Sequence, residues 1–439
     1  MVLDSNLGGP RLNIDPTRQP VLNHRSGWAF ALEALAPLHD PQGILFDSFI
    51  ERTFSWFEKA ECRRGRIPYR EPWLGVFHNP PGVPRWHDYQ NSPQAILARG
   101  SFRESLPNCL GMFTLSKYLA DWLSQRISVP VCALVHPTDV PRLQFSQDAF
   151  LANPQPSVIQ VGWWLRRLHS IFQLRAGHYR KLMLAVSHRY FENMLRRERS
   201  RIALTEAEQS SVATVPFVSN DEYDQLLSRN VVFCHLIDSS ANNAVIECIV
   251  RNTPLLVNRL PAIEEYLGRD YPLYFSTLEE ASAKLARLAT VLAAHEHLCA
   301  LPKDQFSQRA FCEALLRSDV YRKLCGPAPR PDRPAPRRRA EDNHRREPNR
   351  DLSLTLARGA SGAVFVERAE FRPADERGDH GARQILQSLL SGLPMTVVRQ
   401  LTLEDFIRRS APGMEAEAKL AYDALKRALD GDYASCGRA

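Results

Sequence analysis

Short runs of consecutive apolar residues alternate with segments of helical periodicity over the first 325 residues. Short, continuous apolar strands separated by helices are typical of parallel sheets that are covered on both faces. The pattern predicts an α/β protein with two βαβ domains in tandem, residues 1–150 and 151–325. The apolar runs are PVLN (20–23), GILFDSFI (43–50), WLGVF (73–77), GMFTLS (111–116), VPVCALVHP (129–137), SVIQVGWW (157–164), NVVFCHLI (230–237), TPLLVN (253–258) and PLYF (272–275).

Two helix starts are marked by a hydroxyl residue that is followed three positions later by Glu. Ser219 with Glu222, and Ser276 with Glu279, fit this pattern. In such a capping box each of the two side chains bonds the backbone N–H of the other residue. We therefore expect helices to begin directly after these two Ser residues.

The chain changes character after residue 325. Residues 326–351 contain six Pro, eight Arg and five acidic residues, and almost nothing apolar. This composition cannot bury enough surface to offset its ordering entropy, so we expect a disordered linker, with a basic tail that touches a membrane or nucleic acid as the alternative. Beyond it, LSLTLARGASGAVFVERAEF (352–371) predicts a strand pair, and amphipathic helices follow. Residues 352–439 should form a small α+β appendage.

The composition, 44% hydrophobic and 24% charged, is typical of a globular protein. No apolar run reaches the ~18 residues that a membrane helix needs, and the start shows no secretory signal. The nine Cys form no CxxC pair, which disfavours a disulfide framework and a zinc site. We expect a protein of the reducing cytoplasm, with at most peripheral contact at the inner membrane face.

The net charge of +7 includes +3 from the predicted linker. The remaining, mildly basic body fits a small anionic ligand such as a nucleoside diphosphate as well as it fits a polymer. Because the basic run is interrupted by Pro and lacks interleaved aromatic residues, we do not predict nucleic-acid binding. The sequence carries no strong sign of oligomerisation.

The segment 239–268 carries most of the candidate chemistry. A buried strand ends in small polar residues just before it, and Asn242 and Asn243 then begin a helix. In parallel sheets, ligands bind beyond the carboxyl ends of strands, where the N–H groups of a helix N-terminus attract anions. Glu247 on this helix and Glu265 in the next loop should both point into this cleft. We expect the helix start to bind anionic groups and the carboxylates to bind hydroxyls.

Glu247, the strand NTPLLVN (252–258) and Glu265, eighteen residues after Glu247, resemble the donor-binding half of retaining, GT4-like glycosyltransferases of the GT-B fold. That family carries a Glu-x7-Glu motif, a G-x-P-hydrophobic strand and a Gly-Gly-x-x-Glu loop. The resemblance implies that Glu247 contacts the nucleotide ribose. The chain departs from the motif at Ser239, which replaces the first Glu at the catalytic position beside the transferred sugar, and at NRLPA, which replaces the Gly-Gly pair.

The opening of the second domain, residues 157–184, resembles the same family. There a strand is followed by an Arg and then a Lys that hold the donor diphosphate. The resemblance gives the first role to Arg166 or Arg167 and the second to Lys181. Arg offers phosphate oxygens a bidentate fork, and Lys offers them a point charge. A solvated basic face is the alternative interpretation of these cations.

Two loops of the first domain fit the same resemblance. HRSGW (24–28) lies where the family places a glycine-bearing loop near the donor phosphates, so Gly27 would allow close backbone approach and Arg25 would pair with phosphate. His78 lies where such enzymes hold an acceptor-side or catalytic His, and it can act as acid, base or hydroxyl donor. A structural His is the alternative. The family generally needs no bound metal, and we expect no cofactor.

The resemblance implies a metal-independent hexosyltransferase with two Rossmann-like domains that face each other across a cleft. The second domain would bind a nucleotide-sugar donor, and the first would bind an acceptor such as a polysaccharide, a glycolipid or another glycoconjugate precursor. Domain closure would exclude water from the transferred sugar. The alternatives are a GT-B-shaped binding or scaffold protein without transfer activity, and another enzyme with two Rossmann domains, such as a sugar-nucleotide epimerase or a phosphorylase.

Overall fold

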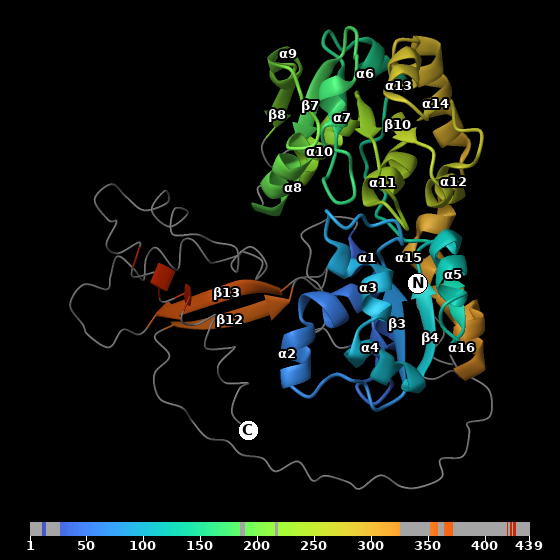
Figure 1. Ribbon diagram of the computed structural model, residues 1–439. Helices are drawn as coiled ribbons and strands as arrows, with labels where there is room; N and C mark the ends of the chain where they lie inside the picture. Colours follow the sequence, from blue (N-terminus) through green and yellow to red (C-terminus); the bar gives the residue numbers. More distant parts are fainter. Residues whose placement is uncertain are drawn as a thin grey trace, which may run out of the picture. The chain divides into compact units, whose positions relative to one another are not determined.

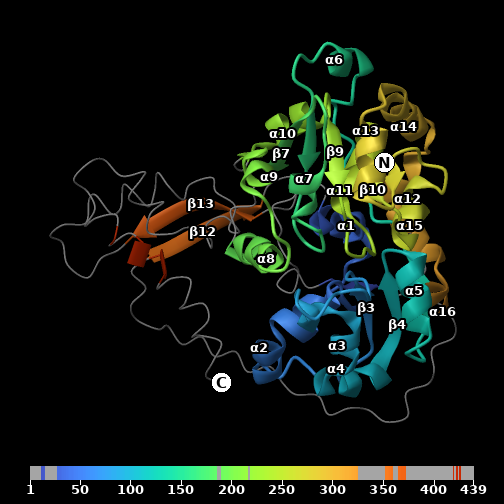
Figure 2. The same ribbon diagram turned by 45° about the horizontal axis from the view of Figure 1, so that its top comes forward.

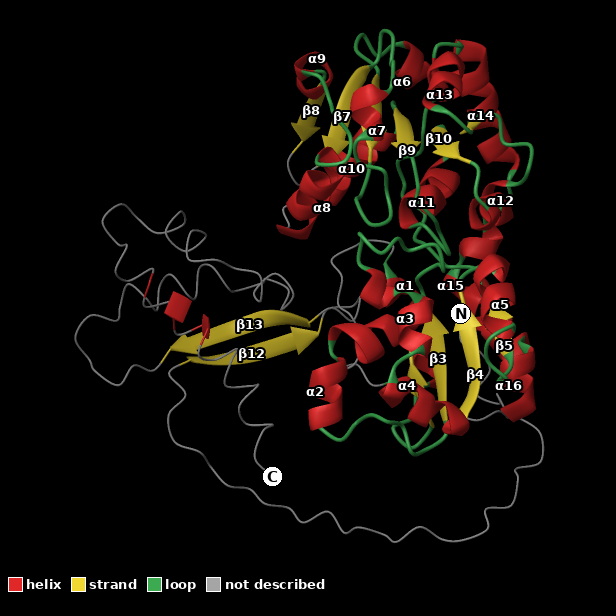
Figure 3. Cartoon of the chain, viewed as in Figure 1, coloured by secondary structure: helices red, strands yellow, loops and turns green. Residues whose placement is uncertain are grey.

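A computed structural model describes residues 11–14, 27–184, 189–215, 218–324, 352–358 and 364–371, and five further positions between 419 and 426. The chain divides into two compact units. The first unit holds two parallel sheets with their helices, as Figure 1 and Figure 3 show, and the second holds an antiparallel strand pair. This arrangement confirms the predicted α/β class with two parallel sheets. The predicted linker lies outside the described residues.

The first sheet contains five parallel strands in chain order. Successive side chains of a strand point to opposite faces, so Leu74 and Val76 lie in one core cluster, whereas Trp73 and Phe77 lie in another. Both faces of this sheet are therefore buried, which explains the uninterrupted apolar runs. The strands are β1 (Leu12–Asn13), β2 (Ile44–Asp47), β3 (Trp73–Phe77), β4 (Cys109–Thr114) and β5 (Val131–Ala133).

One face of the first sheet is covered by α1 and by two helices from much later in the chain, α15 and α16. Phe311 and Leu315 of α15, and Val320 of α16, belong to the same core cluster as Trp28 of α1. Figure 2 shows α16 beside β4 and α5, and a Cβ on Gly111 of β4 would lie 2.6 Å from Val320. The bounds are α1 (Trp28–Ala34), α15 (Gln308–Arg317) and α16 (Asp319–Leu324).

This packing corrects the expected division of the chain, in which all residues from 151 to 325 belonged to the second domain. Hydrophobic periodicity predicts that a helix has a buried face, but it does not say which sheet covers that face. We call the first sheet with its helices, α15 and α16 included, the first lobe. Its other elements are η2 (Ala36–Leu38), the π-helix η3 (Arg52–Trp56), α2 (Glu58–Arg63), η4 (Tyr89–Asn91), α3 (Pro93–Leu97), α4 (Gly100–Ser105), η5 (Leu106–Asn108) and α5 (Lys117–Ser124).

The second sheet contains six parallel strands in the order β11-β10-β9-β6-β7-β8. Counted from its own first strand, this order is 6-5-4-1-2-3, the doubly wound order of a Rossmann fold. From β6 the next strands, β7 and β8, are added on one side, whereas β9, β10 and β11 are added on the other side. The pair of β6 and β9 is therefore the topological switch point. The strands are β6 (Ser157–Gln160), β7 (Arg180–Leu184), β8 (Val212–Val215), β9 (Val231–Cys234), β10 (Leu255–Asn258) and β11 (Tyr274–Phe275).

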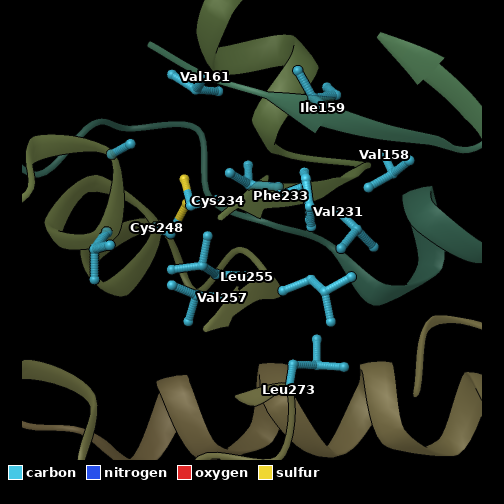
Figure 4. Packing of buried hydrophobic residues seen from close by; sticks show 14 of the residues in the cluster. Val158, Ile159, Val161, Val231, Phe233, Cys234, Cys248, Leu255, Val257 and Leu273 are labelled. Atoms are coloured by element: carbon cyan, nitrogen blue, oxygen red, sulfur yellow. The ribbon is translucent and has the colours of Figure 1, made fainter. Parts of the chain in front are cut away.

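The second sheet and its helices, the second lobe, bury one continuous apolar core. Figure 4 shows Cys234 of β9 beside Cys248 of α11 within this core. The predicted capping box of Ser219 and Glu222 is present at the start of α10. The helices of this part are α6 (Gln147–Leu151), α7 (Ser170–Gln173), α8 (Arg189–Arg199), α9 (Glu206–Ser210), α10 (Asn220–Leu227), α11 (Asn243–Arg251), α12 (Pro261–Leu267), α13 (Leu278–Leu285), α14 (Leu288–Ala300) and η6 (Asp304–Phe306).

The second compact unit contains β12 (Leu352–Arg358) and β13 (Val364–Phe371), which pair antiparallel. This pair confirms the strand pair predicted for residues 352–371. The register shifts between Thr355 and Leu356.

Candidate functional site

The loops that follow β6 and β9 are bonded to each other at the switch point of the second sheet. The Arg167 N–H donates to the His235 carbonyl, and the Ile237 N–H donates to the Leu165 carbonyl, both at 2.8 Å. Leu165 has φ 52°, a left-handed conformation that costs energy for a residue with a Cβ. The two loops therefore hold a defined geometry at the carboxyl end of the sheet, where α/β sheets bind ligands.

The Arg166 guanidinium lies at the start of α11. It donates to the Trp164 carbonyl at 2.7 Å and to Oδ1 of Asn242 at 3.1 Å. A Cβ on Gly162, which has φ 74°, would lie 2.9 Å from this guanidinium, so the glycine leaves room for it. Arg166 is buried, and its Nε has no hydrogen-bond partner among the described residues. Two predicted donor-binding residues, Arg166 and Asn242, are thus in contact.

The start of α11 adds positive potential to this guanidinium. Oδ1 of Asn242 accepts from the Val245 N–H at 3.3 Å and caps the helix, and Asn243 is the first helical residue. The N–H groups at a helix start carry partial positive charge and bind anions. Arg166 and this helix start therefore form a site whose charge and donors suit a phosphate or diphosphate.

Glu247 lies on α11 as predicted, but its carboxylate contacts residues of its own lobe. Oε2 accepts from the Tyr223 hydroxyl at 2.7 Å and lies 3.5 Å from Nη1 of Arg251, whose Nη2 is 2.7 Å from Oδ1 of Asp224. Glu247 and Arg251 are each 1% exposed. Burial and the neighbouring Glu247 carboxylate raise the pKa of Tyr223, so its hydroxyl remains a donor. A contact between Glu247 and a ribose stays a prediction.

Asp238 connects the loop after β9 to the first lobe. Its Oδ2 accepts from the Gly82 N–H at 2.6 Å and from the Tyr118 hydroxyl at 3.2 Å, while Oδ1 accepts from the Ser239 N–H. Burial raises the pKa of Asp238. Ser239, at the predicted catalytic position, is buried, and its Oγ has no partner among the described residues. The carboxylate that contacts the first lobe here therefore belongs to Asp238, which precedes the motif position Ser239.

Glu265, the second predicted carboxylate, caps a helix of the first lobe. Its two oxygens accept from the Lys117 and Tyr118 N–H groups at the start of α5, each at 2.7 Å. A carboxylate at this position is favoured by the positive end of the helix. The loop after β9 thus contacts the loop after β3, and α12, which follows β10, contacts the start of α5, which follows β4, so the carboxyl ends of the two sheets meet; Figure 3 shows the loops between the sheets in green.

His78 follows β3, and its imidazole is held at one nitrogen. Its Nε2 lies 2.9 Å from the Ser48 carbonyl, which requires a proton on Nε2 and leaves Nδ1 unprotonated in the neutral ring. The ring stacks on Phe49 with centroids 3.9 Å apart and meets the edge of Trp28 at 4.4 Å. Burial lowers the pKa of His78 to about 3. The imidazole is therefore neutral at physiological pH, and its catalytic role stays a prediction.

Glu51 is a buried carboxylate that the sequence interpretation missed. Its Oε1 accepts from the His78 and Asn79 N–H groups at 2.8 and 2.7 Å, whereas Oε2 has no partner among the described residues. Burial, with a smaller contribution from Asp47, raises the pKa of Glu51 to about 7. An acidic residue directly after an apolar run at the carboxyl end of a strand was the available signal.

The remaining predicted residues lie in different places. Lys181 is in β7, and its ammonium donates to the Phe172 and Leu174 carbonyls, so it is not brought to Arg166. It lines a cavity of about 560 Å³ beside α7 and α9. Arg167 is exposed, and Gly27 caps α1 through backbone alone. Arg25 lies outside the described residues.

Several buried polar groups near these loops have no hydrogen-bond partner among the described residues. They include both amide atoms of Gln160, the last residue of β6, and both ring nitrogens of His87, whose ring meets Trp164 at 4.6 Å. Burial lowers the pKa of His87 to about 4. Most buried polar groups in proteins are bonded, and exceptions often mark sites that bind water or a ligand. Neither residue was predicted from the sequence.

Among the described residues, no three His, Cys, Asp or Glu side chains form a group that could hold a metal ion. Within the same part of the chain, every helix is too short or too polar to cross a membrane.

No family model matches the chain, and no curated protein matches it. Solved structures similar to it include sucrose-phosphate synthase from Thermosynechococcus elongatus, with 15% identity and a TM-score of 0.49 over 64% of this chain and 73% of that one. HepE from Anabaena, in complex with UDP and glucose, has 11% identity and a TM-score of 0.44 over 56% and 71%. A UDP-forming trehalose-phosphate synthase from Burkholderia vietnamiensis has 15% identity and a TM-score of 0.43 over 67% and 76%.

Proposed function

We propose that this protein is a glycosyltransferase that moves a hexosyl group from a nucleotide sugar to an acceptor hydroxyl. The observation that carries the proposal is the positive site at the switch point, where Arg166 and Asn242 meet at the start of α11. A doubly wound sheet binds ligands at this place, and a diphosphate fits the charge and the donors. The motif resemblance around Glu247 supports the same donor class.

In the proposed reaction, the acceptor oxygen bonds the anomeric carbon while the bond from that carbon to the phosphate oxygen breaks, and the proton of the acceptor hydroxyl passes to the departing diphosphate. The departing nucleoside diphosphate gains negative charge, which Arg166 and the N–H groups of α11 are placed to stabilise. The first lobe would bind the acceptor, and His78, held neutral, would accept a hydrogen bond from its hydroxyl. Because the chain's own groups supply the positive charge, the proposal includes no resident metal or cofactor.

The test compares Arg166→Ala with the matched control Arg167→Ala, its exposed neighbour. Wild type is first screened by thermal shift against UDP, GDP, ADP, CMP and dTDP sugars, because a ligand that binds the native state raises the Tm. We expect Arg166→Ala to weaken binding of the best ligand about tenfold or more, as loss of a charge-assisted bond predicts, while Arg167→Ala changes it by less than about threefold. The loss should be larger at low salt, because salt screens charge interactions.

Two outcomes would contradict the proposal. If no nucleotide sugar stabilises the wild type, the assigned ligand class is wrong. If both Arg variants lose the same affinity, the site does not lie at the start of α11. Binding without any release of nucleoside diphosphate in the presence of varied acceptors would favour the alternative of a binding or scaffold protein.

A further inference from the structure

The cavity that Lys181 lines lies at the amino end of the second sheet, and we call it the amino-end cavity. Arg180 and Lys181 begin β7, Ser211 directly precedes β8, and α7 and α9 flank these starts. Because β6, β7 and β8 run parallel, this end is opposite the carboxyl end of β6, which Arg166 follows. Figure 1 shows α9 at the end of β8 that lies away from β3 and β4. The amino-end cavity is therefore separate from the site at the start of α11.

The loop between α7 and β7, which forms one wall of this cavity, is held in place by hydrogen bonds. The Lys181 ammonium donates to the Phe172 and Leu174 carbonyls at 2.7 and 3.2 Å. The Arg175 N–H donates to Oγ of Ser282 on α13 at 3.1 Å. A volume of about 560 Å³ is typical of sites that bind small molecules, and most such sites are formed before the ligand arrives. The size and the fixed wall both suit a small ligand.

The lining of the amino-end cavity carries excess positive charge. Arg175, Arg180 and Lys181 are cations, whereas Glu208 supplies the one carboxylate among the described residues that line it. Oε2 of Glu208 accepts from the Thr205 N–H and hydroxyl at 2.7 and 3.0 Å, so this carboxylate caps its own helix. Burial lowers the pKa of Lys181, because its ammonium has lost part of its hydration, and a bound anion would compensate for this loss. Arg and Lys side chains together favour a phosphate.

The other lining residues distinguish between the organic groups that could carry this phosphate. The aromatic residues Phe172 and Tyr179 are each 5% exposed, so they offer little ring surface on which a nucleobase could stack. The Ser210 and Ser211 hydroxyls donate to carbonyls of α9, and their oxygens can still accept hydrogen bonds. The Gln173 amide offers both donors and an acceptor. These groups suit a part of the ligand that carries several hydroxyls.

We propose that the amino-end cavity binds a phosphorylated sugar. The phosphate lies against Arg175, Arg180 and Lys181, and the sugar hydroxyls bond the polar groups at the end of α9. This site is additional to the donor site and does not depend on the proposed function, because the two lie at opposite ends of the second sheet. Lys181, which the family resemblance assigned to the donor diphosphate, thus serves a different ligand.

Isothermal titration calorimetry of the full-length protein with ribose 5-phosphate tests the ligand class, with inorganic phosphate, ribose and AMP as comparison ligands. We expect ribose 5-phosphate to bind and inorganic phosphate to bind at least about threefold more weakly, since it lacks the hydroxyls. Ribose should not bind measurably, and AMP should bind no more tightly than ribose 5-phosphate. The proposal is overturned if ribose 5-phosphate does not bind, or if inorganic phosphate or AMP binds more tightly.

A pair of double variants tests the cations of the cavity. Arg175→Gln with Arg180→Gln removes two cations of the lining, and Arg229→Gln with Arg269→Gln removes two exposed cations of the second lobe outside it. We expect the first pair to weaken ribose 5-phosphate binding about tenfold or more and the control pair to weaken it less than about threefold. The difference should shrink at high salt, because salt screens charge interactions. Equal losses would show a response to net charge alone and would overturn the proposal.

A second comparison tests the location without a change of charge. Ala213→Phe places a ring in the cavity from β8, whereas Thr214→Phe places it on the opposite face of the strand. Both residues are exposed, and each variant's Tm is measured to establish that it folds. We expect only Ala213→Phe to weaken ribose 5-phosphate binding, while Arg166→Ala leaves it unchanged. If Arg166→Ala abolishes this binding and Ala213→Phe does not, the phosphate binds at the start of α11 and the amino-end assignment is wrong.

Discussion

Glu51 combines complete burial with two backbone donors on a single carboxylate oxygen, and this sets the expected pH dependence of stability. Its folded pKa of about 7 lies above its ordinary value of 4.5, because burial disfavours the charged form. Between pH 4.5 and 7 the native state therefore holds a proton that the unfolded state has lost. This contribution to stability is complete below pH 4.5 and is lost as the pH rises through 7, by about 3 kcal/mol in total.

We predict that Glu51→Gln removes this dependence while its amide oxygen still accepts from the His78 and Asn79 N–H groups. Relative to wild type, the variant should gain up to about 3 kcal/mol between pH 5 and pH 8 in urea unfolding. The lowered pKa of His78 acts in the opposite direction, but it cancels in the difference between the two proteins. Glu104→Gln, on the exposed side of α4, is the control and should show no such gain. A constant difference between Glu51→Gln and wild type would contradict the prediction.

Glu247 carries a second prediction, about stability. Glu247→Ala would leave the buried Arg251 with the Asp224 carboxylate alone of the two that now contact it, and it would leave the Tyr223 hydroxyl without the carboxylate to which it donates. Removal of one member of a buried ion pair typically costs about 3–5 kcal/mol. Glu264→Ala, which breaks a partly exposed pair with Arg259, should cost less than about 1 kcal/mol.

Urea unfolding of the two Glu variants decides between the structural role and the ligand role. If Glu247→Ala keeps wild-type stability but loses nucleotide-sugar binding, its carboxylate faces the ligand, as the motif resemblance implies. A loss of stability that accounts for any loss of binding would support the buried network. For this reason Arg166 is the better residue with which to test the donor site.

Sequence reasoning at the residue scale located the helix of Glu247 and named Arg166 and Asn242 separately as candidates, but it did not predict the contact between them. It did not find that the Glu247 carboxylate is held by Tyr223, because a motif fixes a position along the chain and leaves the partner of the side chain open. Glu51 was missed for the same reason. Its burial depends on where the loop after β3 returns, a contact across 28 residues of sequence.

At the scale of elements, short sequence patterns predicted the starts of helices, because these depend on residues close to one another in the chain. The capping box at Ser219 is confirmed. The second one is wrong by one residue, because Thr277 caps α13 and accepts from the Glu280 N–H, while the Ser276 N–H donates to the Glu280 carboxylate. Both registers place a hydroxyl residue three positions before a Glu, so the sequence pattern could not distinguish them. Strands β2 to β6 and β9 to β11 overlap the predicted apolar runs, whereas β1, β7 and β8 were not predicted, and the predicted run PVLN (20–23) lies outside the described residues.

Which sheet α15 and α16 cover is decided by packing against residues that are distant in the sequence. Phe311 meets Trp28 with ring centroids 6.0 Å apart, across most of the described chain. Each helix alone is amphipathic and could cover either sheet. The face of the first sheet that carries Leu74 and Val76 is covered by these helices together with α1. Because α15 and α16 follow the second lobe in the chain, the stability of the first lobe depends on residues that come after the second lobe.

At the scale of the whole molecule, this link predicts opposite results for two truncations. A chain that ends after residue 325 keeps both lobes and should unfold in one cooperative transition. A chain that ends after residue 307 loses Phe311, Leu315, Val320 and Tyr321 from the core of the first lobe. At about 1.5–3 kcal/mol for each buried side chain, the loss is comparable to the entire stability of a typical domain.

Thermal unfolding followed by Trp fluorescence separates the two truncations, because Trp28 lies in the core that α15 covers. We expect wild-type emission and one transition for the chain that ends after residue 325. The shorter chain should show red-shifted emission before heating, since water reaches the exposed face of the first sheet. If the shorter chain keeps native emission, the first lobe folds without α15 and α16, and the predicted boundary between the two domains would be restored. If the longer chain fails to fold, residues beyond 325 contribute to one of the two cores.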